Sequence, residues 1–489
     1  MTAKRISKVL AALLSAVMAI SVGGGYFPTG SITAEAAETA ESYTYDSYDG
    51  EYDITSESVT ISSAGIYRIY GNSTETSNTI TVSGSDDIVV VLDNVVISSS
   101  NYYPLELSNS GTTTLVLKGK NTLTAESIQR SAVYKDTTGS LIIGAYGGND
   151  SAGSLSASGN KFAAGIGGAY LNTSECSNIT INSGTITATG GERGAGIGGG
   201  SGSCSNITIN GGIVTAIGGS YAAGIGGSYG GSCSDITING GIVTATGGNF
   251  GTGIGSSYNF SGTGSCSNIT ISGGTVAAVG GTYGAGIGGA YYGSADSITI
   301  SGGTVTATGG TNGAGIGSGY YGSASSDIII YNSSVKASSI SVTPTNAEGE
   351  SVYLYTIPDT TEGCSLIVDD EIYIESITHH TSSDANQYIY LTSDSAEAQT
   401  GIYIYSLSYS ESDGTSVVLT DSLTELEISN AAYLRHFADA VNNGYTYIDA
   451  TVTADIDMTG VEWTPIGTSS NPYAGIFDGQ GHIIKKFDL

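Results

Sequence analysis

The sequence predicts an all-β protein built around a single-stranded parallel β-helix with coils of about 30 residues. Three observations predict this fold. One glycine-rich phrase recurs at a nearly constant interval, each repeat contains short stretches in which apolar and polar residues alternate, and the repeats contain no helical pattern. A small β module and a C-terminal helix followed by strands are expected to complete the chain.

The repeat is marked by an isoleucine between two glycines. This isoleucine occurs with spacings of 31, 28, 29, 33 and 29 residues, at Ile166, Ile197, Ile225, Ile254, Ile287 and Ile316. A period sustained in this way is typical of a solenoid, in which each repeat forms one coil. We therefore expect the six isoleucines to form a structural ladder in the interior.

Each repeat contains three stretches with period-two alternation. In the repeat that begins at Cys204 they are "NITIN", "IVTAIGG" and "AAGIGG". Alternation over a few residues, bounded by glycine and serine, indicates short strands with one buried face. Equivalent strands of successive coils would then stack about 4.8 Å apart. Glycine suits the corners, because it adopts positive φ and lets neighbouring coils approach closely.

The N-terminus has the pattern of an export signal. A basic segment, an apolar run over residues 9–22 and a small-residue site that ends at Ala36 follow one another. The run is shorter than the about 20 residues that span a bilayer, but it suits the apolar region of a signal peptide. We expect a signal peptide over 1–36, a linker over 37–55, and a secreted, cell-surface-associated mature chain that is not inserted into a membrane.

The solenoid is expected to cover residues 56–340, with regular glycine-rich coils over 151–338 and irregular coils that cap the stack before them. A drop in glycine content then indicates a small β module over 341–410.

Residues 411–489 contain the one convincing helical pattern, "NAAYLRHFADAVNNG". Asn430 or Ser429 can cap this helix, and its apolar stripe comprises Leu434, Phe437, Ala438 and Val441. Strands are expected to follow, up to a truncated end.

Charge limits the partners. The chain has 44 acidic and 14 basic residues, a formal net charge of −30. A negative field repels phosphate backbones, which disfavours nucleic acid. Neutral glycans meet no such barrier, whereas an acidic glycan would need Ca²⁺ or a local basic patch.

A nucleotide site is excluded by the repeats. "GERGAGIGGG" satisfies G-x-G-x-x-G, but a nucleotide loop occurs once and opens a helix, whereas this phrase recurs and leads into strands. No cofactor is expected, apart from Ca²⁺, for which no site can be placed.

Catalytic residues are not expected. The regular coils contain five acidic residues, each in a different repeat: Glu175, Glu192, Asp235, Asp296 and Asp327. Glycoside hydrolysis uses two carboxylates at a defined separation, and no such pair is evident. A polysaccharide lyase or hydrolase is the least favoured interpretation.

Four of the five cysteines occupy one repeat position: Cys176, Cys204, Cys233 and Cys266. Stacked coils would place them about 4.8 Å apart, within the Cα range for disulfides. Export makes Cys176–Cys204 and Cys233–Cys266 bridges conceivable. Later repeats carry Ala295 and Ser325 there, which favours a structural ladder of small residues over disulfides or a metal site.

Aromatic residues form two series beside the glycine corners. One lies four residues after the repeat isoleucine, with Ser201 as the exception: Tyr170, Tyr229, Tyr258, Tyr291 and Tyr320. The other precedes the isoleucine: Phe162, Arg193, Tyr221, Phe250, Tyr283 and Asn312. Rows of exposed rings would suit the C–H faces of sugar rings, at roughly one sugar per coil. A self-stacking ladder that shields the loops is the other interpretation.

Two parts of the chain resemble known families. "GTITATGGERGAGIGGG" and "NITINGGIVTATGG", preceded by "LVLKGKNTLTA", resemble the right-handed β-helix domains of secreted clostridial-type surface proteins described as containing carbohydrate-binding domains. "LEISNAAYLRHFADAVNNG", "TADIDMTG" and "YAGIFDGQGHII" resemble the opening of a GLUG-type surface β-helix. The resemblances imply a right-handed coil and a modular extracellular protein, some of whose relatives are thought to bind plant polysaccharides such as pectate.

We therefore expect a non-catalytic, monomeric surface module that binds a polysaccharide or cell-wall glycan through its aromatic rows. A structural adhesin or spacer, whose solenoid holds a distal domain away from the cell wall, is the main alternative.

Overall fold

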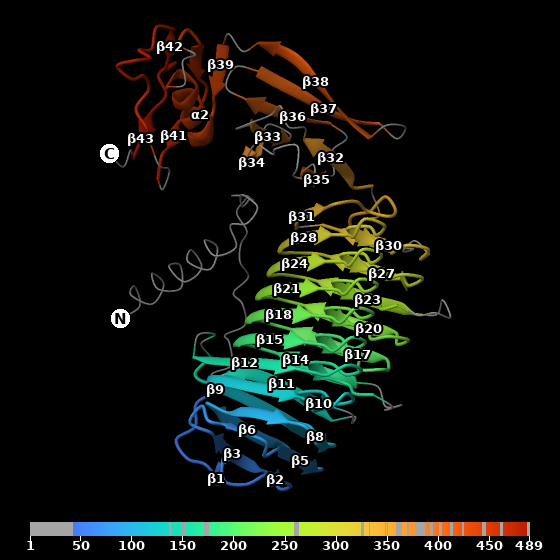
Figure 1. Cartoon of the computed structure of the whole chain (residues 1–489). Coiled ribbons are helices and arrows are strands. Elements are labelled where there is room, and N and C mark those ends of the chain that lie inside the picture. The colour runs from blue at the N-terminus through green and yellow to red at the C-terminus, as the bar shows by residue number, and fades with distance from the viewer. Residues whose placement is uncertain are drawn as a thin grey trace. The chain divides into compact units, whose positions relative to one another are not determined.

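The chain divides into two compact units, a solenoid that ends at Tyr353 and a C-terminal unit, in the computed structural model shown in Figure 1. The structure describes residues 43–486, so the predicted signal peptide lies outside the described residues. Within that range the description omits 136–138, 149, 151, 171–175, 259–263, 324–326, 332, 348, 350, 358–363, 369–370, 378–386, 392–394, 401–402, 411–413, 423–424, 443–445 and 460–462, and it covers only the backbone of 353–425. No helix in the described part of the chain is long and apolar enough to cross a membrane.

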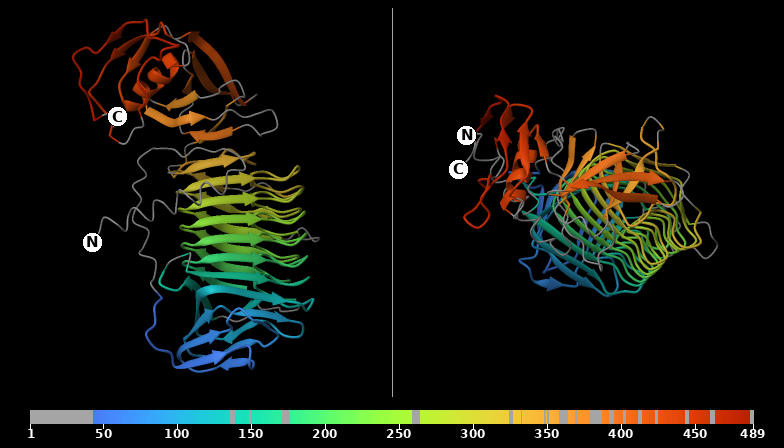
Figure 2. Two further views of the ribbon diagram at one scale, coloured as in Figure 1. Left: turned by 60° about the vertical axis from the view of Figure 1, so that its left-hand side comes forward. Right: turned by 90° about the horizontal axis from the view of Figure 1, so that it is seen from above.

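Each regular coil contributes one strand to each of three parallel faces of the solenoid. One coil passes from β14 (Cys176–Ile181) on the first face to β15 (Thr185–Thr189) on the second and β16 (Ile197–Gly198) on the third. Every strand pairs in parallel with its equivalent in the next coil. The predicted fold class is confirmed: an all-β chain with a parallel solenoid of about ten turns and right-handed type. Figure 2 shows the coils stacked on one another.

The remaining strands continue these faces. The first face also contains β1 (Gly50–Asp53), β3 (Gly65–Tyr70), β6 (Ile88–Asp93), β9 (Thr112–Ala125), β11 (Ser140–Ala145), β17 (Cys204–Ile209), β20 (Cys233–Ile238), β23 (Ser265–Ile271), β26 (Ser294–Ala295), β27 (Ser297–Ile300) and β30 (Asp327–Ile330). The second contains β4 (Glu75–Thr76), β7 (Val96–Ser99), the second half of β9, β12 (Gly153–Ser158), β18 (Ile213–Ile217), β21 (Ile242–Thr246), β24 (Thr275–Val279), β28 (Thr304–Thr308) and β31 (Ser334–Ala337). The third contains β2 (Val59–Ile61), β5 (Ile80–Gly84), β8 (Leu105–Asn109), β10 (Val133–Lys135), β13 (Ile166–Gly167), β19 (Ile225–Gly226), β22 (Ile254–Gly255), β25 (Ile287–Gly288) and β29 (Ile316–Gly317).

The six repeat isoleucines form a file along the inside of the third face. Their strands pair isoleucine to isoleucine in register from one coil to the next. All six side chains are fully buried, together with the inward isoleucine, valine and alanine side chains of the other two faces. These files together make a continuous apolar core. Full burial of a side chain of this size contributes about 1.5–3 kcal/mol to the stability of the fold.

Both ends of the solenoid extend beyond the predicted boundaries. β1 pairs with β3, so the first strand lies inside the segment 37–55 that was expected to be a linker. At the other end, Ile340 pairs with Ile316, and Thr345 pairs with Ile329. Residues on both sides of the limits 56–340 thus pair with strands of the solenoid, although "GEYD" and the residues after Ile340 carry little of the alternating apolar pattern that marks the other strands.

One file of glycines sets how closely the coils approach. A Cβ atom on Gly248 would lie 1.8 Å from the carbonyl oxygen of Gly219, and one on Gly281 would lie 1.8 Å from that of Gly248. The carbonyl group of one coil therefore occupies the space that a side chain would need in the next.

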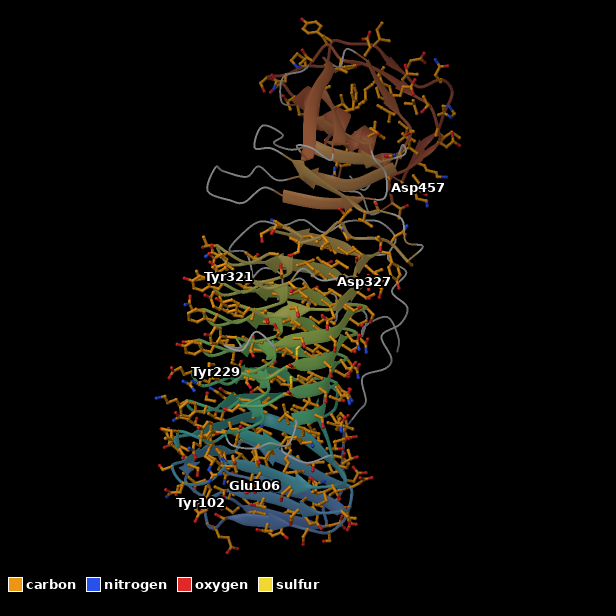
Figure 3. All side chains as sticks on the ribbon, turned by 90° about the vertical axis from the view of Figure 1, so that its right-hand side faces the viewer. Tyr102, Glu106, Tyr229, Tyr321, Asp327 and Asp457 are labelled. Carbon is orange, nitrogen blue, oxygen red and sulfur yellow. A yellow bond between two sulfur atoms is a disulfide. The ribbon has the colours of Figure 1, made fainter. Side chains whose placement is uncertain are left out.

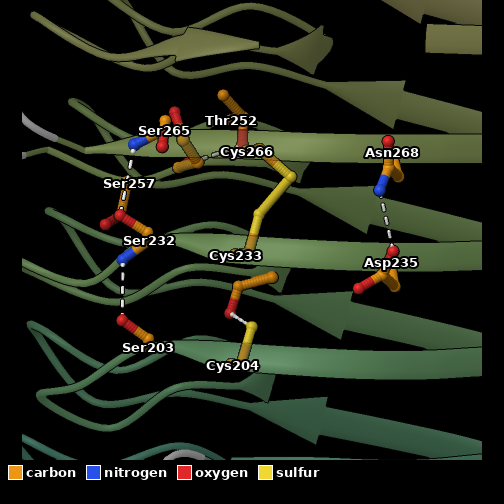
Figure 4. Close-up of a disulfide and its surroundings, with 12 residues drawn as sticks. Ser203, Cys204, Ser232, Cys233, Asp235, Thr252, Ser257, Ser265, Cys266 and Asn268 are labelled. Atoms are coloured by element: carbon orange, nitrogen blue, oxygen red, sulfur yellow. Dashed lines mark hydrogen bonds between the residues drawn. A yellow bond between two sulfur atoms is a disulfide. The ribbon is translucent and has the colours of Figure 1, made fainter. Parts of the chain in front are cut away.

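The cysteine ladder lies on the first face, with all four residues in register. Cys233 and Cys266 form a disulfide, shown in Figure 4, whereas Cys176 and Cys204 are buried thiols. Burial raises the pKa of the Cys176 thiol to about 12. The preference for an unbridged ladder is therefore wrong at one pair. The Cα atoms of Cys233 and Cys266 are 4.6 Å apart, within bridging range, and the two side chains are turned so that their sulfur atoms meet.

The described part of the C-terminal unit contains further sheets and a helix. Its antiparallel sheet comprises β33 (Cys364–Val368), β34 (Glu371–Ile377), β36 (Ser395–Thr400), β37 (Tyr403–Ser410) and β38 (Gly414–Ser422). A separate two-stranded sheet consists of β32 (Tyr353–Ile357) and β35 (Gln387–Leu391). Parallel strands follow: β39 (Glu425–Ile428), β40 (Asp449–Val452), β41 (Ile456–Asp457), β42 (Phe477–Asp478) and β43 (Ile484–Lys485). β37 and β38 pair with each other on either side of the boundary predicted at 410/411.

The helix α2 (Ala431–Asn442) has the predicted cap and stripe. The Asn430 side chain accepts a hydrogen bond from the backbone N–H of Tyr433 at 3.0 Å, which identifies Asn430 as the capping residue. All four stripe residues are buried, and most of them pack against β39 and β40. The GLUG-type assignment of this region stays a prediction.

Replacing Gly248 with alanine is expected to lower the free energy of unfolding by about 3 kcal/mol, because the new Cβ overlaps backbone that moves only if the coils separate. Gly230→Ala is the matched control. A Cβ there meets nothing within 4 Å, so only its positive φ is unfavourable, by about 1 kcal/mol. Thermal unfolding of both variants measures the difference, and equal losses would contradict the role assigned to Gly248.

Replacing Cys266 with alanine is expected to lower stability by about 3 kcal/mol, because the disulfide closes a loop between residues 33 apart. Cys204→Ala, at the same position of another coil, removes only a small buried side chain and is expected to lose about 1 kcal/mol. Unfolding with and without reductant tests this. Reductant should destabilise the wild-type protein and leave the stability of Cys266→Ala unchanged. A wild-type protein that is equally stable with and without reductant would show that the bridge is not formed.

Candidate functional site

The two aromatic series meet at one corner of the solenoid because the third face is very narrow. Its regular strands contain only an isoleucine and a glycine, so the loops at their two ends lie close together. Backbone hydrogen bonds join these loops: the N–H of Tyr258 donates to the carbonyl of Tyr221 at 3.3 Å, and that of Tyr320 donates to the carbonyl of Tyr283 at 2.9 Å. Each ring of one series is thereby held beside a ring of the other.

Three rings form what we call the stacked column: Tyr221, Phe250 and Tyr283. Successive ring centroids are 5.1 Å apart in both steps, with interplanar angles of 2° and 10°. The facing sides of these rings therefore cover one another. A sugar cannot stack between them, so this column has the geometry of the self-stacking ladder.

Four rings form the tilted column: Tyr229, Tyr258, Tyr291 and Tyr320. Their centroids are 5.7, 5.5 and 5.9 Å apart, and neighbouring planes are inclined by 38°, 30° and 32°. The rings of the two columns also meet edge to face, at 84° between Tyr221 and Tyr229 and at 71° between Tyr283 and Tyr291. The tilted column therefore leaves parts of its ring faces half-exposed.

Tyr170 is separated from the other predicted residues. Its ring packs on Phe162, with centroids 4.8 Å apart. In the next coil, where Ser201 interrupts the tyrosine series, the guanidinium of Arg193 lies 5.1 Å from the Phe162 ring and 4.4 Å from the Tyr229 ring. An arginine thus continues the aromatic file by cation–π contact. Of the eight predicted rings, seven form one cluster and Tyr170 lies beyond Arg193.

Two tyrosines that the sequence analysis did not single out complete the cluster. Tyr292 and Tyr321, which we call the tyrosine pair, follow directly after two members of the tilted column, and their rings stack on each other at 5.4 Å and 18°. They are 40% and 64% exposed. Figure 3 shows Tyr321 and Tyr229 along the same edge of the solenoid. The sequence could have pointed to this pair, because two repeats have two consecutive tyrosines where another repeat has Tyr229 followed by Gly230.

The phenol groups of this corner hydrogen-bond to one another. The hydroxyl of Tyr320 donates to that of Tyr321 at 3.2 Å. A hydrogen bond with Tyr292, followed by loss of hydration, raises the pKa of Tyr291 to about 12. A hydrogen bond with Tyr321 likewise raises the pKa of Tyr320. These two side chains are therefore neutral donors and acceptors at physiological pH.

Three basic side chains gather at one end of the corner, together with one acidic residue, Glu192. Arg130, Lys161 and Arg193 lie on successive coils, joined by hydrogen bonds from Asn160 N–H to the Arg130 carbonyl and from Arg193 N–H to the Lys161 carbonyl. Arg130 covers the ring of Tyr103 at 4.3 Å. In the described part of the chain, the Nε of Arg193 is buried without a hydrogen-bond partner. A chain with 14 basic residues thus places three of them on one corner, which we call the cationic end.

Asp235 and Asp327 are too far apart to act as the carboxylate pair of a glycoside hydrolase. Asp235 and Asp327 share a register position three coils apart, or about 14 Å at the strand spacing, beyond the 5–9.5 Å of hydrolase pairs. Asp235 accepts a hydrogen bond from Asn268 at 2.9 Å, and Glu192 lies 3.9 Å from Lys161. Glu175 is outside the described residues. Among the residues that are described, no group of three or more His, Cys, Asp or Glu is placed to hold a metal ion.

Comparison with protein families gives one match, to the beta helix repeat, at residues 179–201, 207–229, 236–258, 269–291 and 298–320. Each matched segment starts at an isoleucine of the first face. It ends at a tyrosine of the tilted column, or at Ser201 in the coil that lacks this tyrosine. No curated protein and no solved structure matches the chain. The matched segments coincide with five successive coils, so the chain is a parallel β-helix repeat protein with clusters of aromatic side chains on its surface.

Proposed function

We propose that the solenoid is a non-catalytic extracellular module that binds polysaccharide along its aromatic corner. The observation that carries this proposal is the continuous surface cluster of nine rings formed by the two columns and the tyrosine pair. Monomeric proteins rarely leave a large apolar patch uncovered unless it meets a partner. Aromatic rings with hydroxyl groups at their rims suit sugars, which have apolar C–H faces and hydroxyl edges.

The repeat of the corner supports an extended ligand. The tilted column presents one ring per coil at centroid separations of 5.5–5.9 Å. A polymer of similar units can meet several of these rings at once, so that weak contacts add. A single small molecule would use only one of them.

The cationic end favours acidic sugars as part of the ligand. With a net charge of −30, the chain as a whole repels polyanions. Arg130, Lys161 and Arg193 provide the local basic patch that an acidic glycan needs. Arginine also pairs with carboxylates through two parallel hydrogen bonds.

The location and partners follow from the same argument. The export pattern of residues 1–36 supports secretion and a place at the cell surface. Ligand binding by one rigid corner needs no second subunit, so we propose a monomer. Nucleic acid is disfavoured by charge.

A structural rod is the second candidate function. The ring faces of the stacked column cover one another at interplanar angles of 2° and 10°, which stiffens the corner without any ligand. In that case the cluster protects the loops, and the solenoid acts as a spacer or adhesin stalk.

Replacing Tyr229 and Tyr258 together with alanine is expected to weaken polysaccharide binding roughly tenfold, because two adjacent rings of the tilted column are lost. Affinity electrophoresis in gels that contain hydroxyethylcellulose, xyloglucan or polygalacturonate measures the change. Tyr447→Ala, an equally simple truncation of an exposed tyrosine in the C-terminal unit, is the control and should bind normally. If the wild-type protein migrates freely in all gels and the double variant is only less stable, the rod is supported instead. Release of reducing or unsaturated ends from any of these polymers would indicate an enzyme.

Replacing Lys161 and Arg193 together with glutamine is expected to weaken binding to polygalacturonate several-fold, since an exposed charge pair contributes about 0.2–1 kcal/mol. Binding to neutral hydroxyethylcellulose should not change. The effect on polygalacturonate should shrink as salt is raised, because salt screens exposed charges. Lys336→Gln, on β31 of the second face, is the matched control. Equal losses on the neutral and the acidic polymer would contradict a charge-specific role.

A further inference from the structure

We infer that Tyr292 and Tyr321 are the anchoring residues of the proposed glycan site, on which a sugar ring with an apolar C–H face stacks. The inference rests on the proposed function and moves the main contact from the two columns to the tyrosine pair. Four observations support it: the backbone conformation of the pair, its position outside the packed core, its exposed ring surface and its hydroxyl groups.

Both residues have an unfavourable backbone conformation. Their φ angles are +58° and +56°. This left-handed region is a genuine outlier for a bulky side chain, and glycine, asparagine and aspartate occupy it far more readily. In the regular coils the other described non-glycine residues with positive φ are of the tolerant types: Asn178, Asn206, Asp235 and Asn268.

The fold itself accepts glycine at this position. Gly230, at φ +80°, makes the same ladder contact as Tyr292: the N–H of each donates to the carbonyl of the next tilted-column residue, at 2.9 Å in both cases. A Cβ on Gly230 would meet nothing within 4 Å. A side chain at this position thus projects away from the packed coil, and core packing does not offset the strain. Residues held in such conformations cluster at functional sites.

The tyrosine pair is more exposed than the rings of the two columns, which are half-buried. The facing sides of the stacked column cover one another, and the ring of Tyr291 is met edge to face by Tyr292 at 4.4 Å and 76°. Tyr321 is the more exposed of the pair, at 64%. Its contacts with Tyr292 and with Tyr320, at 4.0 Å, hold its ring in a fixed orientation. An ordered and exposed ring loses little entropy when a sugar stacks on it.

The hydroxyl of Tyr321 is prepared to act as a donor. It accepts the hydrogen bond from Tyr320, so its own hydrogen points elsewhere. A sugar hydroxyl beside the ring can accept that hydrogen bond. Stacking on the ring and hydrogen bonding at its rim would then act on the same sugar residue.

Three double variants test the inference, each measured by affinity electrophoresis on hydroxyethylcellulose and polygalacturonate and by thermal unfolding. Tyr292→Ala with Tyr321→Ala removes the rings and keeps the strain. Tyr292→Asn with Tyr321→Asn removes the rings and also relieves the backbone strain, because asparagine tolerates positive φ. Tyr292→Phe with Tyr321→Phe keeps the rings without the hydroxyls.

We expect the alanine and asparagine variants to lose binding by at least roughly tenfold, and the phenylalanine variant to stay within about threefold of the wild-type protein. The asparagine variant should unfold at a temperature about 2 °C or more above the alanine variant. Tyr102→Ala, at a 67% exposed tyrosine outside the cluster, should bind normally. Phe250→Ala, in the stacked column, should lower the unfolding temperature and affect binding less than the asparagine variant does.

The outcomes separate this inference from the proposed function. If the wild-type protein binds and the asparagine variant binds equally well, the inference is overturned and the proposed function stands. A phenylalanine variant as weak as the alanine variant overturns the stacking role. If the wild-type protein binds neither probe, both proposals are overturned.

Discussion

Parallel backbone hydrogen bonding between successive coils is the constraint on which the rest of the structure depends. It repeats at about 4.8 Å and fixes each residue opposite its counterpart. The carbonyl of Gly219 fills the place of a side chain on Gly248, so a side chain at this position would force the two coils apart. The isoleucine file, the cysteine ladder and the aromatic columns follow from this single register.

The same register explains why the aromatic corner is partly closed to ligands. Rings at identical positions in coils this close are in van der Waals contact, and the loops of the stacked column hold them nearly parallel. The facing sides of neighbouring rings are then covered by ring contacts and are not available to a ligand. The tilted column is only half-exposed, and the most open ring of the corner, Tyr321, stands outside both columns. The amount of ring surface open to a ligand therefore increases where a coil departs from the repeat.

The periodic features could be predicted from the sequence, and the departures could not. The isoleucine spacing and the three alternating stretches predicted the core and the three strands per coil, because burial and strand period act locally. Whether Cys233 bridges Cys266 while Cys176 and Cys204 stay thiols depends on how the side chains turn within the ladder, which periodicity does not record. The sequence analysis also left open whether Tyr221 and Phe250 stack on each other or expose their faces to sugars, because periodicity does not record how the rings turn. Tyr292 was missed because its unusual feature is a φ angle, which the sequence shows only as a tyrosine where another coil has glycine.

The two-residue strands of the third face have a consequence for evolution. Each regular coil pairs through its strands with the coils beside it, so a coil is a repeating unit of backbone. Unequal recombination between nearly identical repeats would insert or delete a whole unit without disturbing either end of the stack. Each such event would lengthen or shorten the aromatic corner by one step. Related genes in a population would then encode corners of different lengths on the same rod.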